Sequence, residues 1–260
     1  MRALKNLFAL VVIVAVLGGG ALVAFRIART KPSTPEEIKP NLMAVSSAGS
    51  YLYAARIGQR VLLFDTGPDP AGNPVDVALG ALHAGRGDVS DVFLTHGHGD
   101  HLAAAGAFAG AHLHLGQGDV AFAEGRAAWD NPLLRVMTKG MGTPSINVND
   151  PMSGVLVIDL GGGKTVKAIP VPGHTPGSYV FLYDEVLFTG DTAVWKQGRL
   201  DRGPGLFDSN SDQVKVSVAA LKQELTGAEI GAVCTGHGGC TPLGLGRSLL
   251  DDFITRVGGG

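Results

Sequence analysis

The sequence has little charge and no periodic glycine. Only 17% of its 260 residues are charged, whereas 45% are hydrophobic. A disordered chain has the opposite balance, so this composition excludes disorder as the main state. The 39 glycines follow no three-residue period, which excludes a collagen-like rod. The length allows one large α/β domain or two small ones.

An excess of positive charge is also missing, since the formal net charge is −2. Residues 1–31 contain five basic residues and no acid, whereas the rest of the chain has 16 Lys or Arg against 23 Asp or Glu. The main body is therefore acidic. Nucleic-acid binding needs a basic surface, so we expect no nucleic-acid partner.

Charge is absent altogether from residues 6–25, and the whole chain has a mean hydropathy of +0.21. Twenty mostly apolar residues form a helix about 30 Å long, which is enough to cross a bilayer. The sequence thus predicts a transmembrane anchor within residues 1–30 and a proline-containing tether over 31–41. The alternative is a signal peptide with a small-residue cleavage site at Gly19-Gly20-Ala21. We expect an anchored domain in the periplasm or at the cell exterior, or a secreted one if the segment is cleaved.

Strand-like and helix-like segments alternate after residue 41. Strands are expected at 51–56, 61–65, 92–94, 111–115, 155–158, 165–170, 178–183, 185–189 and 230–234. Helices are expected at 75–84, 102–109, 119–128, 211–225 and 243–257. Each half has strands followed by helices, which predicts two packed sheets with helices outside, in a single domain over 42–260.

The densest group of reactive side chains is Thr95-His96-Gly97-His98-Gly99-Asp100-His101, which follows an apolar strand. Imidazole nitrogens and carboxylate oxygens suit zinc, and neighbouring residues of a loop can converge on one ion. The pattern therefore predicts a metal site at the end of this strand.

Three further segments place candidate ligands beside strands. His174 lies in a Pro- and Gly-containing turn before a strand, Asp191 follows an apolar strand, and His237 lies in a glycine-rich loop after a strand. Each of these residues alone is weak evidence for a metal site. Together with the first motif they predict a binuclear site.

These motifs, LLFDTG, THGHGDH, PGHTPGS, FTGDT and TGHGG, resemble those of the metallo-β-lactamase superfamily over about residues 42–260. The resemblance implies a four-layer αβ/βα sandwich with two metal ions at one edge of the sheets. It also implies three sets of ligands, which are His96, His98 and His174 for the first ion, Asp100, His101 and His237 for the second, and Asp191 bridging both.

The resemblance further implies a hydrolase that holds two Zn²⁺, with Fe or Mn as alternatives, and acts on a small molecule. A metal-bridging hydroxide would attack an ester, thioester, lactone or lactam carbonyl. Asp100 would be catalytic, orienting the hydroxide or moving its proton. Asp65 is expected either to contact a ligand from outside or to accept from turn amides. Two alternatives stay open, a single-iron persulfide dioxygenase and a non-catalytic, membrane-tethered metal-binding module.

The branch of the superfamily, whether lactonase, glyoxalase-II-like or β-lactamase-like, is not fixed by the sequence. The segment Leu102–Gly106 departs from the glycine pair common in the family. Residues 129–150 and 195–207 are expected to line an apolar part of the substrate or to pack as ordinary lids.

The remaining histidines and the two cysteines have structural interpretations. His112 and His114 share one face of an expected strand, and the family pattern gives them no ligand role. Cys234 and Cys240 lie on either side of His237. They would form a disulfide outside the cytosol or stay as two buried thiols.

Overall fold

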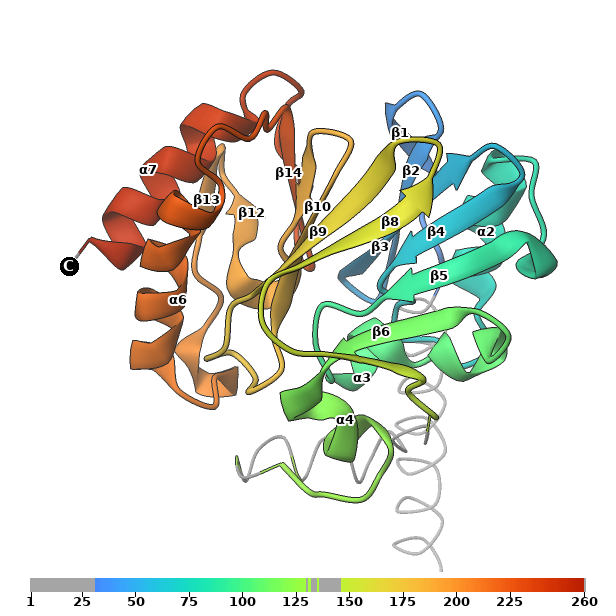
Figure 1. Cartoon of the computed structure of the whole chain (residues 1–260), viewed down its shortest axis with the longest axis horizontal. Helices are drawn as coiled ribbons and strands as arrows, with labels where there is room; N and C mark the ends of the chain where they lie inside the picture. Colours follow the sequence, from blue (N-terminus) through green and yellow to red (C-terminus); the bar gives the residue numbers. More distant parts are fainter. Residues whose placement is uncertain (1–30, 130, 132–134, 136–145, 260) are drawn as a thin grey trace, which may run out of the picture. The chain divides into compact units, whose positions relative to one another are not determined.

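The first of two sheets contains seven strands, in the order in which they occur along the chain. The computed structural model describes residues 31–129, 131, 135 and 146–259. Neighbouring strands are antiparallel from the first to the fourth and parallel from the fourth to the seventh. The strands are β1 (Glu36–Lys39), β2 (Leu42–Ser47), β3 (Ser50–Ile57), β4 (Arg60–Phe64), β5 (Val89–Phe93), β6 (His112–Gly116) and β7 (Asp150–Met152). Because β4 to β6 are parallel, the loops that follow them leave the sheet at the same edge (Figure 1).

The second sheet has six strands in the order β15-β14-β11-β10-β9-β8. Only β11 and β14 pair in parallel, so the loops that follow these two also lie at one edge. The strands are β8 (Leu156–Gly161), β9 (Lys164–Pro170), β10 (Tyr179–Tyr183), β11 (Val186–Phe188), β14 (Ala232–Thr235) and β15 (Gly239–Cys240). A separate hairpin is formed by β12 (Val194–Lys196) and β13 (Arg199–Asp201).

Helices cover the outer face of each sheet (Figure 1). The helices of the first half are α2 (Asn73–Ala81), α3 (Gly99–Leu102) and α4 (Gln117–Ala123), and those of the second are α6 (Ser211–Glu224) and α7 (Gly246–Gly258). Helix α6 begins where the Asn210 side chain accepts hydrogen bonds from the backbone N–H groups of Asp212 and Gln213. This is the N-cap arrangement that asparagine favours.

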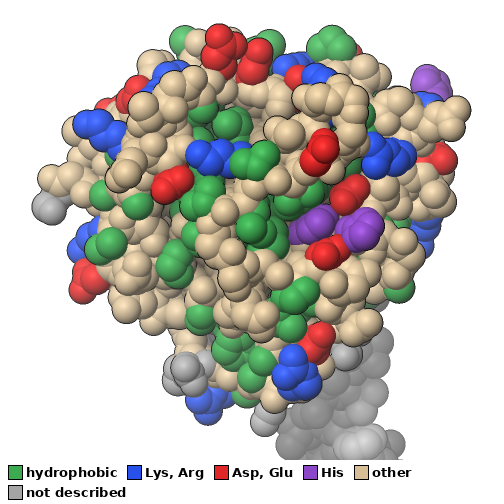
Figure 2. All heavy atoms as spheres, in the orientation of Figure 1, with side chains coloured by type: hydrophobic (Ala, Val, Ile, Leu, Met, Phe, Trp, Pro, Cys, Tyr) green, Lys and Arg blue, Asp and Glu red, His purple; other side chains and the backbone are tan. Residues whose placement is uncertain are grey.

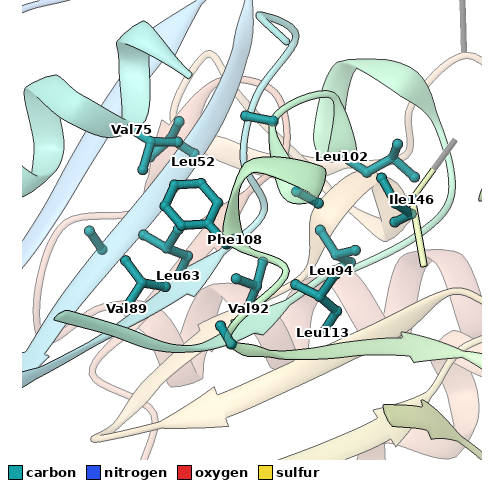
Figure 3. Close-up of a cluster of buried hydrophobic side chains, with 14 of the residues drawn as sticks. Leu52, Leu63, Val75, Val89, Val92, Leu94, Leu102, Phe108, Leu113 and Ile146 are labelled. Carbon is teal, nitrogen blue, oxygen red and sulfur yellow. The ribbon is translucent and has the colours of Figure 1, made fainter. Parts of the chain in front are cut away.

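Three apolar cores separate these layers. The core between the sheets contains four phenylalanines, of which Phe64 and Phe188 stack with ring centroids 3.9 Å apart. A second core joins the first sheet to its helices, where Val75, Leu102 and Phe108 pack on strand residues (Figure 3). A third joins the second sheet to α6 and α7. The predicted sandwich of two sheets with helices outside is therefore confirmed.

One predicted helix is wrong. Residues 102–109 do not form a continuous helix, because α3 ends at Leu102 and Ala105–Phe108 form a short 3₁₀ helix. The N–H of Ala103 donates to the Gly67 carbonyl and that of Ala104 to the Thr66 hydroxyl, at 3.2 Å each. These bonds replace the helical ones and tie α3 to the end of β4.

Two other parts of the chain contain strands where loops were expected. β1 lies inside the segment predicted as a tether, and the β12–β13 hairpin, which begins at Val194, overlaps the expected loop 195–207. The anchor predicted for residues 1–30 lies outside the described residues and stays a prediction. Among the residues that are described, no helix combines the length and the apolar character needed to cross a membrane.

Candidate metal centre

Three buried histidines from two loops form a first cluster. His96 and His98 follow β5, and His174 precedes β10. His96 Nε2 lies 3.0 Å from His98 Nδ1, which lies 3.1 Å from His174 Nε2. None of the three residues is more than 7% exposed. Three ring nitrogens therefore face one another at a point that can hold a single ion.

A second cluster lies at the more exposed side of the first. Asp100 Oδ2 is 3.4 Å from His237 Nε2 and 3.6 Å from His101 Nε2. His101 is fully buried, whereas the side chains of Asp100 and His237 are 39% and 34% exposed. The site is therefore open to solvent at Asp100 and His237.

Asp191 lies between the two clusters, in a 3₁₀ turn after β11. Its Oδ1 is 3.3 Å from His101 Nε2, and its Oδ2 is 3.6 Å from His174 Nε2 and 3.4 Å from His237 Nε2. The carboxylate therefore faces both clusters. All seven side chains that the sequence identified are brought together.

The imidazoles are oriented by acceptors on their outer nitrogens. Nδ1 of His101 donates to Asp65 at 2.8 Å, and Nδ1 of His174 donates to Asp208 at 3.1 Å. Nδ1 of His237 donates to the Gly49 carbonyl at 2.8 Å. With Nδ1 held by an outside acceptor, Nε2 is the nitrogen that faces the site in all three rings, and it can give its lone pair to a metal ion once its own proton is lost.

Asp65 is one of these acceptors, as one of the two sequence interpretations expected. Its carboxylate also accepts from the N–H and the hydroxyl of Thr95, both at 2.8 Å. It therefore contacts His101 from outside and fixes the start of the His96 loop as well.

Burial and charge act differently on the two clusters. Burial, reinforced by neighbouring histidines, lowers the pKa of His96 well below its ordinary value and that of His98 to about 3. Burial also lowers the pKa of His237, but Asp100 and Asp191 outweigh it and raise this pKa to about 10. His96 and His98 thus present neutral nitrogens, whereas His237 in the second cluster favours positive charge.

The carboxylates of the second cluster stay ionised. Burial raises the pKa of Asp100, but His101 and His237 bring it down to about 2. The pKa of Asp191 is likewise held well below its ordinary value, mainly because His101 outweighs burial. Two ionised carboxylates beside imidazole nitrogens are suited to a divalent cation.

Unpaired buried atoms support the same interpretation. Within the described residues, His101 Nε2, Asp191 Oδ1 and His98 Nε2 are buried side-chain atoms without a hydrogen-bond partner. Unpaired buried polar atoms are costly, and the first two face the clusters. Three groups of possible ligands, each with its atoms within 4.8 Å of one another, are formed by the seven residues. The donor set therefore fits metal ions.

Sequence reasoning missed two acidic residues. Asp208 precedes α6 and accepts a hydrogen bond from His174. Asp119 lies in the first turn of α4 and contacts both loops of the first cluster. Asp208 has no distinctive sequence context. Asp119 has one, since it is an acid in an otherwise apolar segment directly after a strand.

The expected substrate-binding segments meet beside the site. The Trp129 ring packs edge-on against His98 at 4.9 Å, and the Asn131 side chain donates to the Leu206 carbonyl at 2.8 Å. Of the segment 129–150, residues 130, 132–134 and 136–145 lie outside the described part of the chain.

His112 and His114 lie elsewhere. His112 Nδ1 is 2.6 Å from Asp150, and His114 Nε2 is 3.0 Å from Asp91. Together these four side chains line a pocket beside β7 and β8. Figure 2 shows histidine side chains next to acidic ones on the face that it draws. Each histidine is thus paired with its own carboxylate.

Comparison with known families agrees with this geometry. A family model described as the metallo-beta-lactamase superfamily matches residues 47–237, which include all seven side chains. The chain belongs to the metallo-β-lactamase superfamily. The resemblance found in the sequence motifs is therefore confirmed.

Solved metallo-β-lactamases share the fold. BJP-1, a subclass B3 enzyme of Bradyrhizobium japonicum, is 24% identical with a TM-score of 0.61, over 80% of this chain and 79% of that one. MIM-1 from Novosphingobium pentaromativorans is 18% identical with a TM-score of 0.61, over 89% and 82%. MIM-2 is 19% identical with a TM-score of 0.67, over 88% and 89%. At these identities the similarity concerns the fold.

Curated relatives found by sequence are named hydroxyacylglutathione hydrolase. The one from Anaeromyxobacter dehalogenans is 33% identical over 147 residues, which is 56% of this chain and 47% of that protein. The one from Halorhodospira halophila is 26% identical over 194 residues, which is 73% and 62%. The chain thus spans about half to three fifths of their length. The relatives are named as hydrolases, which agrees with the predicted class of enzyme.

Proposed function

We propose that this protein is a binuclear zinc hydrolase that cleaves an activated carbonyl compound, a thioester or ester first and a lactone or lactam second. One observation carries the proposal: two clusters of imidazole and carboxylate ligands face the same carboxylate, Asp191. The thioester is placed first because the curated relatives are named hydroxyacylglutathione hydrolase.

The proposed ligands of one ion are His96, His98 and His174, and those of the other are Asp100, His101 and His237, with Asp191 shared. Two bound divalent ions would lower the pKa of a water that they share and polarise the substrate carbonyl. Imidazole and carboxylate ligands without thiolate suit zinc, with iron or manganese as substitutes.

Asp100 is the residue we assign to proton movement. Its carboxylate is ionised and is the more exposed of the two in the site, so it can accept a hydrogen bond from an attacking water at the solvent side. His237 holds the Asp100 side chain in place, because its Nε2 lies 3.4 Å from Asp100 Oδ2 while its Nδ1 is fixed by the Gly49 carbonyl.

We also propose an extracytoplasmic location for the body. Cys234 and Cys240 form a disulfide between β14 and β15. Disulfides persist in oxidising compartments and are rare in the cytosol, which supports the periplasm or the cell exterior.

Metal analysis together with a substrate panel tests the function. The full-length protein, purified without chelator, should contain two zinc ions per chain and hydrolyse at least one of a hydroxyacyl thioester, a simple ester, a lactone and a β-lactam. One iron with oxygen uptake on a persulfide would support the dioxygenase instead. Two ions without turnover of any panel member would support a metal-binding module, and absence of metal would refute all three.

A further inference from the structure

A completely buried carboxylate joins the two loops that carry the first histidine cluster. Asp119 lies in the first turn of α4, and its side chain is 0% exposed. Its hydrogen-bond partners are Gly97, Thr175 and Gly177, none of which is one of the seven candidate ligands. A buried acid is costly unless its oxygens are well bonded, so its partners explain why it is there.

Its three hydrogen bonds reach both loops. Oδ2 accepts from the Gly97 N–H at 2.7 Å and from the Thr175 hydroxyl at 2.6 Å, and Oδ1 accepts from the Gly177 N–H at 2.7 Å. Gly97 lies between His96 and His98, and Thr175 directly follows His174. One side chain thus bonds the backbone of one histidine loop and a neighbour of the third histidine.

The surrounding glycines permit this approach. A Cβ on Gly177 would lie 2.5 Å from the Asp119 nitrogen and 2.7 Å from its Cγ. A Cβ on Gly97 would lie 3.1 Å from the Asp119 Cβ, and one on Gly118 would lie 2.6 Å from the Pro176 backbone. Gly97 and Gly177 therefore leave the space that the Asp119 side chain occupies, and a side chain at either position would crowd it.

The charge state fits the donors. Burial raises the pKa of Asp119, and hydrogen bonds from Thr175, Gly97 and Gly177 oppose that effect. The two amide N–H groups can only donate, so the ionised carboxylate is the form that satisfies both.

We infer that Asp119 is a positioning residue, which sets the distance between the His96–His98 loop and the His174 loop and thereby the affinity of the first metal position. The inference rests on the proposed function. The start of the His96 loop is also joined to β10 by the hydrogen bond from the Tyr179 N–H to the Thr95 carbonyl, whereas Asp119 bonds Gly97, which lies between the two histidines.

Asp119→Asn is the direct test in the full-length protein. An amide keeps the shape but turns one oxygen into an N–H donor that faces Gly177 or Gly97. Zinc competition with a chelator of known affinity should show one of the two ions bound about 10–100-fold more weakly, the usual effect of losing a residue that supports a ligand. Wild-type affinity for both ions would overturn the inference.

Thr175 offers a milder pair of variants. Thr175→Val removes one of the three bonds and leaves the carboxylate, so a smaller loss of affinity at the same ion is expected. Thr175→Ser keeps the hydroxyl and should restore wild-type affinity. A general loss of stability would not distinguish these two variants in this way.

Asp91→Asn is the matched control. Asp91 is also a buried acid, 6% exposed, but it pairs with His114 away from the metal centre. This variant should lose stability while keeping zinc affinity. Equal loss of affinity in Asp91→Asn and Asp119→Asn would overturn the positioning role.

Hydrogen exchange separates failure of this inference from failure of the proposed function. In the metal-free protein, the Gly97 and Gly177 amides should exchange faster in Asp119→Asn than in the wild type. If the wild type bound no zinc, the proposed function would fail, whereas faster exchange would still support the link between the loops. Unchanged exchange at both amides would overturn the link itself.

Discussion

At the scale of single residues, Asp191 is the side chain on which both clusters depend. Its two oxygens lie 3.3 Å from His101 Nε2 and 3.6 Å from His174 Nε2. Asp191→Asn replaces one charged oxygen with an amide, so we expect at least about 100-fold weaker metal binding and a parallel loss of hydrolysis. Metal analysis after dialysis checks the first, and the substrate panel checks the second. Asp212→Asn, on a carboxylate that is 90% exposed, is the control. Full metal content and activity in Asp191→Asn would contradict the shared role.

The backbone beside Asp191 leaves no room for a side chain at Gly236. A Cβ there would lie 2.7 Å from His101 Cε1 and closer still to Asp191 Oδ1. We expect Gly236→Ala to move these ligands and to reduce metal content and activity by about tenfold or more. Gly203→Ala is the matched control, because its Cβ would meet nothing nearer than 3.7 Å. If both variants behaved alike, packing at Gly236 would not explain the effect.

His237 makes the stability of the metal-free protein depend on pH. Burial lowers its pKa, but Asp100 and Asp191 raise it to about 10, above the ordinary 6.5. A raised pKa contributes stability in full below about pH 6.5, and this is lost as the pH rises through about 10. Thermal unfolding of chelator-treated protein should therefore show a falling Tm over that range. His237→Gln should flatten the fall, and an equally steep fall in that variant would assign it to other groups.

At the scale of elements, the sequence predicts the helices and strands whose signals lie within a few neighbouring residues. The hairpin of β3 and β4 turns at Gly58, with φ +60°, and both its apolar strands and its glycine are visible in the sequence. The helix expected at 102–109 failed because Ala103 and Ala104 bond to Thr66 and Gly67, some 36 residues earlier in the chain. Such competition depends on tertiary contacts that no local window contains.

The residues of the candidate site likewise fall into those that local motifs predict and those that they do not. Its seven candidate ligands were found because each lies in a short motif at a strand end. Asp119 and Asp208 were not, since their partners are distant: Gly97 and Thr175 for one, and His174 for the other. Supporting contacts have no fixed spacing, so they become visible only in three dimensions.

The disulfide between β14 and β15 holds these two strands together beside the His237 loop. Cys234 and Cys240 are directly opposite in this antiparallel pair and enclose the loop of His237. Closing so short a loop is worth about 2 kcal/mol in the chain-entropy model. We expect reduction to lower stability by about that amount and to weaken one zinc ion more than the other, measured by denaturant unfolding and chelator competition. A double Cys→Ser variant should not respond to reductant, and a response there would point to another target.

At the scale of the whole molecule, the site joins the two halves of the sandwich. Four candidate ligands lie in the segment that follows β5 of the first sheet, and His174, Asp191 and His237 lie in segments beside strands of the second. Metal that binds the folded state stabilises it by about 2.7 kcal/mol at a hundredfold excess over Kd, which corresponds to about 5–10 °C in Tm. Chelation should lower Tm by that order, and zinc should restore it. A Tm that changed neither on chelation nor on addition of zinc would argue against ions bound between the two halves.

The chain passes from one sheet to the other through the exposed turn at Gly154, between β7 and β8. The first cluster needs His174 from beyond that turn, and the second needs His237. A protein cut there would leave two fragments, neither of which could complete either cluster alone. Metal binding would then require the two fragments to associate, so the amount of bound metal would report how many fragments had paired.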